Sequence, residues 1–132
     1  MALHSQASGS FWFAAVPMAA AVATIRTLKE ENAIEAMDRM GARLRDGITA
    51  QARSWDLPVN YTGPPAMPYL TFAGDTGYEL GSVFAAQALR GGAYLHPRHN
   101  WFVSAAMTED DLALVLEATD QAFAAVRKHL SQ

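Results

Sequence analysis

Side chains that could take part in catalysis or metal binding lie close together in one stretch of the last third of the chain. His96 and His99 lie on either side of Pro97-Arg98, and Ser104 follows them. Two histidines could bind a metal ion, but no third ligand stands at turn or helical spacing, and hydrogen-bonded loop histidines are the simpler interpretation. Ser104 and a histidine could imitate a nucleophile and its base, yet no nucleophile-elbow glycines surround it, and a serine within a strand is simpler. These residues alone therefore predict neither a metal site nor a catalytic residue.

Two further clusters have structural explanations. The acidic patch Glu109–Asp111 is what the N-terminus of a helix favours. The glycines at positions 74, 77 and 81 lack the spacing of a phosphate-binding loop. Ser8-Gly9-Ser10 is more suggestive, because small hydroxyl residues beside a glycine expose backbone N–H groups that can bind phosphate. An ordinary turn before a helix is the competing interpretation of that segment.

Composition limits the kinds of function that are possible. The 132 residues suffice for one domain, with 51% hydrophobic and 17% charged residues, which excludes a disordered chain. The net charge of −3 argues against binding to nucleic acid or to an anionic membrane. There is no cysteine, so disulfides, thiolate zinc sites and a cysteine nucleophile are all excluded. We expect a cytoplasmic protein.

The apolar run from Phe11 to Ala23 could imitate a targeting segment. No basic residue precedes it as in a secretory signal, although Ala21-Val22-Ala23 is similar to a cleavage site. The run is also shorter than the roughly 20 residues of a transmembrane helix. We therefore expect the start of a buried helix here.

The elements expected from the sequence fall into three regions of a single domain. Residues 1–15 form a lead-in, 16–56 are helical, and 57–132 contain short strands and helices. In the helical region, apolar residues recur at helical spacing along two successive helices, with a break near Glu31 and an end at Pro58. The apolar stripe of the second helix comprises Ile34, Met37, Met40, Leu44, Ile48 and Trp55.

The remaining region alternates between strands and helices. Expected strands cover 59–61, 69–72, 93–95 and 101–105. A capping box of Thr76 and Glu79 predicts a helix that ends at Gly91-Gly92, and Thr108 with Asp111 predicts the cap of a last helix with an apolar face reaching Leu130. The fold class is therefore α+β, with a small antiparallel or mixed sheet packed against helices.

Several motifs, in order along nearly the whole chain, resemble the class III pyridoxal-phosphate-dependent aminotransferases, especially the glutamate-1-semialdehyde aminomutase-like branch. They are Gly9-Ser10-Phe11-Trp12, Ala23-Thr24-Ile25, Gly92-Ala93-Tyr94-Leu95-His96-Pro97 and the stretch from Ser104 to Asp111. Met107 departs from the histidine that is usual at its position, which puts a polar role there in doubt. The resemblance implies the C-terminal small domain of a fold-type-I enzyme.

The resemblance also implies how the chain relates to pyridoxal phosphate. Ser10, with Gly9, would contact the cofactor phosphate in the assembled enzyme, and the region 94–100 would border the substrate mouth. The chain has only two lysines, Lys29 and Lys128, both at positions expected to be solvated, so neither suits covalent attachment of the cofactor. We therefore predict no catalytic residue in this chain and no covalently bound cofactor for it alone.

Two hypotheses follow from the missing lysine. In the first, the chain is the C-terminal domain or split subunit of an aminotransferase or aminomutase, active only with a lysine-bearing large domain. In the second, it is a non-catalytic binding or oligomerisation module derived from that domain. Three consecutive aromatics, Phe11–Phe13, cannot all face one core, which favours a partner or a homo-oligomer.

Overall fold

The computed structural model describes residues 14–132, which belong to two compact units, one ending at Ala33 and the other spanning Ile34–Gln132. The described part of the first unit is essentially one helix, α1 (Ala15–Glu30), as the sequence predicts. No residue of α1 is buried, so the expectation of a buried helix start is wrong for its described part. Alanine is its commonest residue and the helix has little amphipathic character, which leaves large side chains such as Val16 and Met18 exposed.

The second helix, α2 (Ala33–Ser54), supplies one wall of the core through Leu44, Ile48 and Ala52. The expected stripe is confirmed there, but its first member, Ile34, is exposed. The helix ends before Pro58 because Asp56 adopts a left-handed conformation, with φ 53°. Its N–H and that of Leu57 then return to carbonyls of the last turn, as in a Schellman motif.

A hairpin follows α2. Strands β1 (Val59–Thr62) and β2 (Tyr69–Phe72) pair antiparallel with Val59 opposite Phe72, close to the bounds that the sequence predicts. Side chains of β2 alternate between partly buried and buried, so Leu70 and Phe72 enter the core. Within the described residues the sheet contains these two strands.

Helix α3 (Glu79–Arg90) begins differently from the prediction. The expected capping box on Thr76 is wrong: the residue before the helix is Tyr78, at φ 59°, and its side chain makes no cap. The Asp75 carboxylate takes this role, accepting hydrogen bonds from the N–H groups of Glu79 at 2.8 Å and Gly81 at 2.9 Å. Because a carboxylate has two oxygens, Asp75 satisfies two free N–H groups at once. The expected end of the helix at Gly91-Gly92 is confirmed.

The chain from Ala93 to Met107 is a loop, and the two strands expected in it are absent from the described structure. Two of its N–H groups still bind a neighbouring segment: Trp101 donates to the Pro68 carbonyl at 2.8 Å and Val103 to Ala66 at 2.9 Å. Proline has no N–H to return, so Pro68 cannot complete the reciprocal pair that a ladder requires. The segment is therefore extended without becoming a strand.

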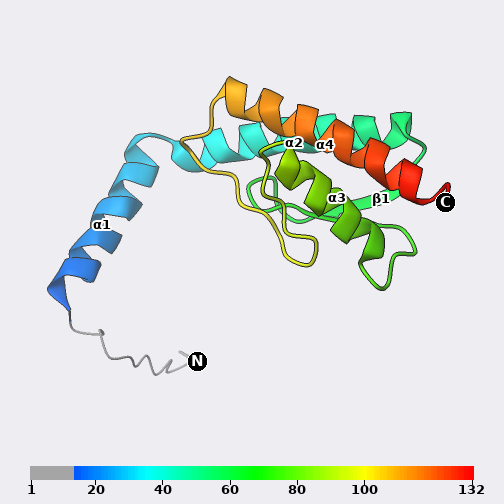
Figure 1. Ribbon diagram of the computed structural model, residues 1–132. Coiled ribbons are helices and arrows are strands. Elements are labelled where there is room, and N and C mark those ends of the chain that lie inside the picture. Colours follow the sequence, from blue (N-terminus) through cyan, green and yellow to red (C-terminus); the bar gives the residue numbers. More distant parts are fainter. Residues whose placement is uncertain (1–13) are drawn as a thin grey trace, which may run out of the picture. The chain divides into compact units, whose positions relative to one another are not determined.

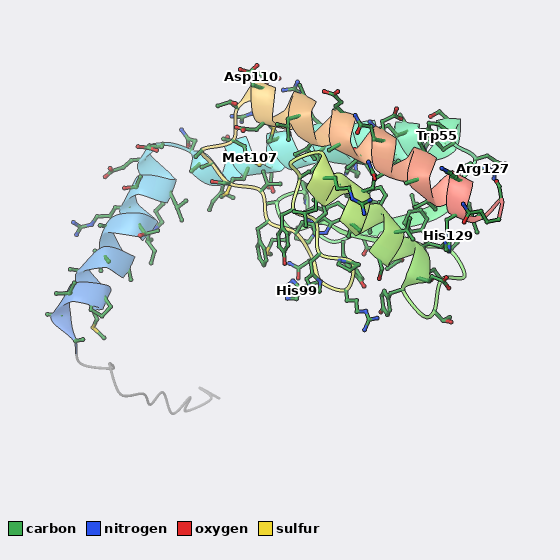
Figure 2. All side chains as sticks on the ribbon, in the orientation of Figure 1. Trp55, His99, Met107, Asp110, Arg127 and His129 are labelled. Atoms are coloured by element: carbon green, nitrogen blue, oxygen red, sulfur yellow. The ribbon has the colours of Figure 1, made fainter. Side chains whose placement is uncertain are left out.

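Helix α4 (Glu109–His129) carries the capping box that the sequence predicts. The backbone N–H of Thr108 donates to Asp111 Oδ2 at 2.7 Å, and the Asp111 N–H donates to Thr108 Oγ1 at 3.3 Å. Acidic residues occupy the first turn, including Asp110, and basic ones occupy the last, so both complement the helix dipole (Figure 2). The apolar face ends earlier than expected, because Leu130 is exposed.

The core of the second unit lies where α2, α3, α4 and the hairpin meet (Figure 1). Phe72, Phe84 and Phe123 form an aromatic trio with ring centroids 4.9–6.0 Å apart. Polar bonds join α2 to α4 beside it: Gln51 Nε2 donates to the Leu116 carbonyl at 2.7 Å, and Trp55 Nε1 donates to Asp120 at 2.8 Å. The predicted α+β class, a small antiparallel sheet packed against helices, is confirmed.

Removing the cap of α4 should destabilise the second unit measurably. Thr108→Ala loses the side-chain acceptor for the Asp111 N–H, and we expect the free energy of unfolding to fall by about 1 kcal/mol. The Thr108 N–H also lowers the pKa of the Asp111 carboxyl from its ordinary value. The stability that the bond between the Thr108 N–H and the Asp111 carboxylate contributes is therefore complete above the ordinary pKa of an aspartate. It is lost as pH falls through the lowered pKa of Asp111. Urea denaturation at neutral and acidic pH measures both effects, and an unchanged midpoint at neutral pH would contradict the cap.

Candidate functional site

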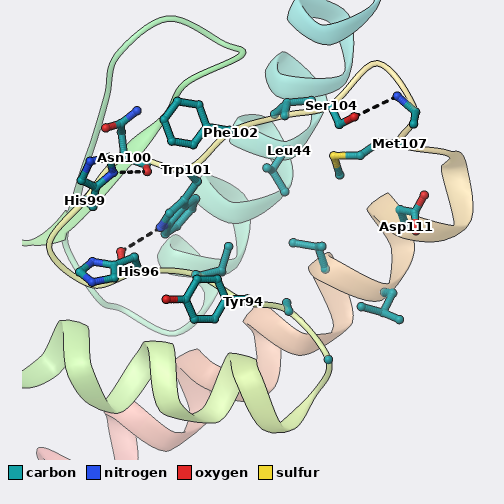
Figure 3. Close-up of a pocket in the computed structure, with 17 residues that line it drawn as sticks. Leu44, Tyr94, His96, His99, Asn100, Trp101, Phe102, Ser104, Met107 and Asp111 are labelled. Atoms are coloured by element: carbon teal, nitrogen blue, oxygen red, sulfur yellow. Dashed lines mark hydrogen bonds between the residues drawn. The ribbon is translucent and has the colours of Figure 1, made fainter. Parts of the chain in front are cut away.

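The second unit contains a cleft of about 700 Å³. The loop that follows α3 forms most of it, and Leu44 of α2 and Leu114 of α4 complete the wall. Figure 3 shows the imidazoles of His96 and His99 at one end of the cleft and Met107 with Asp111 at the other. A volume of this size lies within the range of small-molecule sites.

Large apolar side chains around the cleft are exposed. Tyr94 is 75%, Phe102 67% and Leu114 46% exposed, whereas Trp101 and Val103 are buried and anchor the loop to the core. Along residues 101–103, buried and exposed side chains alternate because successive side chains of extended backbone point to opposite sides. The cleft therefore has exposed apolar walls, and the buried side chains of Trp101 and Val103 fix the loop that forms most of it.

Short-range hydrogen bonds fix the histidine end. Trp101 Nε1 donates to the His96 carbonyl at 3.0 Å, which ties the loop to its buried anchor. His96 Nδ1 accepts the N–H of Arg98 at 3.1 Å, and His99 Nδ1 bonds to the Asn100 carbonyl at 2.8 Å. The Arg98 guanidinium lies 5.3 Å from the centre of the Tyr78 ring, a cation–π contact that holds the outer part of the loop.

The opposite end carries the charge. Asp111 lines the cleft, and hydrogen bonds from Thr108 lower the pKa of its carboxyl, so it is ionised near neutral pH. Two residues before Asp111, Glu109 forms a bidentate ion pair with Arg43 of α2. This pair lowers the pKa of Glu109 and raises that of Arg43. A smaller hollow of about 220 Å³ lies over this pair.

The structure brings together only some of the residues that the sequence singles out. His96, His99 and Ser104 all line the cleft. Ser104 does not act with a histidine, however, because its Oγ accepts the Ala106 N–H at 3.2 Å and Figure 3 shows it away from both rings. Ser104 also lies in a loop rather than in the expected strand.

Other predicted residues lie elsewhere. Gly9 and Ser10, predicted to contact the cofactor phosphate, fall outside the described residues, as does the aromatic run 11–13. Lys29 and Lys128 are both exposed on helices, which confirms that they are solvated.

Sequence reasoning missed the wall of the cleft. Leu44 was expected only as a core residue, and Leu114 lies beside the predicted apolar face of the last helix, yet both line the cleft. The alternation from Trp101 to Val103 was visible in the sequence, but it indicated a strand instead of an anchored loop.

Across residues 14–132, no three His, Cys, Asp or Glu side chains are grouped in a way that could hold a metal ion. None of the helices in this range is both long and apolar enough to cross a membrane.

Known proteins with similar sequences include two aminotransferases and an aminomutase. The chain is 50% identical over 119 residues, 90% of its length, to aminopentol aminotransferase of Sphingopyxis macrogoltabida. It is 34% identical over 123 residues to glutamate-1-semialdehyde 2,1-aminomutase of Laribacter hongkongensis, and 29% identical over 114 residues to 3-aminobutyryl-CoA aminotransferase of Cloacimonas acidaminovorans. The chain spans 28–29% of the length of these relatives. No protein-family model matches the sequence.

Solved structures agree with these matches. The FumI protein of Sphingopyxis sp. MTA144, in its pyridoxal-phosphate internal aldimine form, superposes with a TM-score of 0.89 at 46% identity, covering 98% of this chain and 31% of FumI. An omega-transaminase from Sphaerobacter thermophilus superposes with a TM-score of 0.81 at 16% identity, covering 93% of this chain and 31% of its own, which shows the shared fold. The chain therefore belongs to the class III pyridoxal-phosphate-dependent aminotransferase family and corresponds to a C-terminal portion of such an enzyme.

Proposed function

We propose that this chain is the C-terminal domain or a split subunit of an amino-group-transferring enzyme, and that it works with a portion that carries the cofactor-binding lysine. The match at 50% identity across 90% of the chain carries this proposal. The relatives' names include transaminases and an aminomutase, so the proposed reaction class is transfer of an amino group with pyridoxal phosphate. We expect the assembled enzyme to act in the cytoplasm.

The residues that line the cleft indicate whether pyridoxal phosphate could bind there. A pyridoxal phosphate site needs donors for a phosphate and a lysine for the aldehyde. The described residues that line the cleft include neither lysine nor arginine, and their one formally charged member, Asp111, is negative. The cleft therefore does not fit the cofactor. We place the cofactor outside it, against the lysine-bearing portion, with Ser10 and Gly9 contacting the phosphate.

A hybrid enzyme tests the proposal. The preceding portion of the S. macrogoltabida aminotransferase is joined to this chain in place of its own matching 28%. We expect the hybrid to regain amino-group transfer from the amine of the parent enzyme, while the truncated parent without any C-terminal portion does not. A hybrid that folds and binds pyridoxal phosphate but transfers no amino group would contradict the proposal. Stable self-assembly of this chain together with an inactive hybrid would favour the non-catalytic module instead.

Ser10→Ala in the active hybrid tests the phosphate contact. Loss of one hydrogen bond to a charged group should weaken binding of pyridoxal phosphate by about 10-fold. Ser5→Ala, in the same segment, is the matched control and should leave the affinity unchanged. Equal affinities for both variants and the parent hybrid would remove Ser10 from the cofactor site.

A further inference from the structure

We propose that the extended segment 101–104 is an open edge, to which the lysine-bearing portion of the enzyme adds one strand. The added strand is apolar and carries no acidic residue. Naming the lysine-bearing portion as its source rests on the proposed function, whereas the open edge itself depends only on residues of the second unit.

The two sides of this segment differ in their hydrogen bonds. Trp101 donates its N–H to the Pro68 carbonyl at 2.8 Å, and Val103 donates to Ala66 at 2.9 Å. In extended backbone the N–H groups of successive residues point to opposite sides, so the main chain of Phe102 faces away from this neighbour. Within the part of the chain that the structure describes, the N–H and the carbonyl of Phe102 make no backbone hydrogen bond. The segment is therefore paired on one side and open on the other.

The residue types along the segment leave the open side unprotected. The aromatic and β-branched residues at 101–103 favour extended backbone, and for this reason the sequence predicts a strand there. Native proteins protect exposed edges with charged residues, with proline or by covering them with another segment. Positions 101–106 contain no charged residue and no proline, which favours the third means. An added strand would supply the missing main-chain hydrogen bonds.

The side chains beside the open edge define the chemistry of the added strand. Tyr94, Phe102 and Leu114 line the adjoining cleft and are 46–75% exposed. Covering them with apolar side chains removes this surface from water, which is favourable in proportion to the area covered. Asp111 is the one formally charged residue of the lining and is ionised near neutral pH, so it would repel an acidic strand.

The lysine-bearing portion fits as the source better than a second copy of this chain. The superposition covers 98% of the chain but only 31% of FumI, so most of the length of that enzyme lies outside the matching region. A second copy would bring another net charge of −3 and a second Asp111 to a surface that already repels acidic groups. We therefore assign the added strand to the lysine-bearing portion.

Hydrogen–deuterium exchange of the 132-residue chain and of the hybrid enzyme tests the inference at single amides. In the chain alone, the Phe102 amide should exchange rapidly, whereas the Val103 amide is protected by its bond to Ala66. In the hybrid we expect exchange of Phe102 to slow by about 10-fold or more, as one buried hydrogen bond predicts. Val103, protected in both, is the internal control.

Two results of this measurement would overturn the proposal. The first is an equal exchange rate of the Phe102 amide in the chain and in the hybrid, because no strand would then be added. The second is slow exchange of Phe102 in the chain alone. The chain itself would then cover the edge or, where the rate depends on protein concentration, a second copy would do so.

Proline substitutions distinguish the two sides of the segment in the chain alone. Phe102→Pro removes an N–H that has no backbone partner, so its midpoint of urea denaturation should be no lower than that of Phe102→Ala, which loses the same ring but keeps the N–H. Val103→Pro removes a bonded N–H and should lower the midpoint. A lower midpoint for Phe102→Pro than for Phe102→Ala would contradict an open side at Phe102.

The same pair of variants tests the added strand in the hybrid. The Ser104 amide lies on the same side as that of Phe102, and Phe102→Pro should speed its exchange about 10-fold relative to Phe102→Ala. Equal rates would contradict the added strand. Amino-group transfer is measured separately. An inactive hybrid with a protected Phe102 amide would contradict the proposed function alone, and an active hybrid with an unprotected one would contradict the open edge alone.

Discussion

Phe123→Ala should lower the free energy of unfolding by about 3–5 kcal/mol, the usual cost of removing a buried phenylalanine ring. Phe123 is fully buried, and its ring lies 4.9 Å from that of Phe84 and 6.0 Å from that of Phe72, centre to centre. It thus joins α4 to both α3 and the hairpin. Truncation would leave a cavity that three elements must close together. Urea denaturation followed by circular dichroism measures the loss.

Met18→Ala is the control for this prediction. Met18 lies on α1, where no residue is buried, and alanine is a better helix former, so we expect a change within about 0.5 kcal/mol. The contrast tests whether the second unit carries the stability. A larger loss for Met18→Ala than for Phe123→Ala would contradict both the packing of the trio and the exposure of α1.

Gly41→Ala should destabilise the second unit although alanine favours a helix. A Cβ atom at this buried position of α2 would lie 1.9 Å from the Pro65 carbonyl oxygen and 2.4 Å from its carbon. Backbone cannot rotate away as a side chain can, so the helix and the hairpin turn must separate. We expect a net loss of roughly 1–3 kcal/mol, after the gain in helix propensity.

Gly47→Ala, on the same helix, distinguishes the effect of helix propensity from the effect of a close contact with backbone. Its added Cβ would meet the end of the Leu116 side chain at 2.5 Å, and that side chain can change rotamer. We expect a change within about 1 kcal/mol, because the propensity gain offsets the repacking. Thermal unfolding of both variants decides the matter. Equal stability of the two variants would show that the Pro65 turn moves freely.

Local chemistry made much of this fold predictable from sequence. The capping box of Thr108 with Asp111 and the glycines that end α3 involve neighbours in the chain, so residue type and spacing were sufficient. The hairpin was predictable for the same reason, since turn residues separate two short apolar strands. The family resemblance rested on motifs of this local kind, and the relatives confirm it.

The predictions were wrong where the path of the backbone, rather than residue type and spacing, decides which groups meet. Asp75 displaced Thr76 as the cap of α3 because the path of the preceding turn, rather than spacing, aims its carboxylate at two N–H groups. The expected strand after Asn100 became a loop because its neighbour proved to be Pro68, which has no N–H to return.

The cleft depends on tertiary structure more than any other feature. The sequence by itself determined the helices, the two strands of the hairpin and the family, because periodicity, caps and motifs act over a few residues. Only packing decided that Leu44 and Leu114, distant in the chain, line one wall with His96 and His99 at its end. Side-chain type does not reveal which helix faces which loop. Which helix faces which loop depends on burying the aromatic trio around Phe123, a contact among three separate elements.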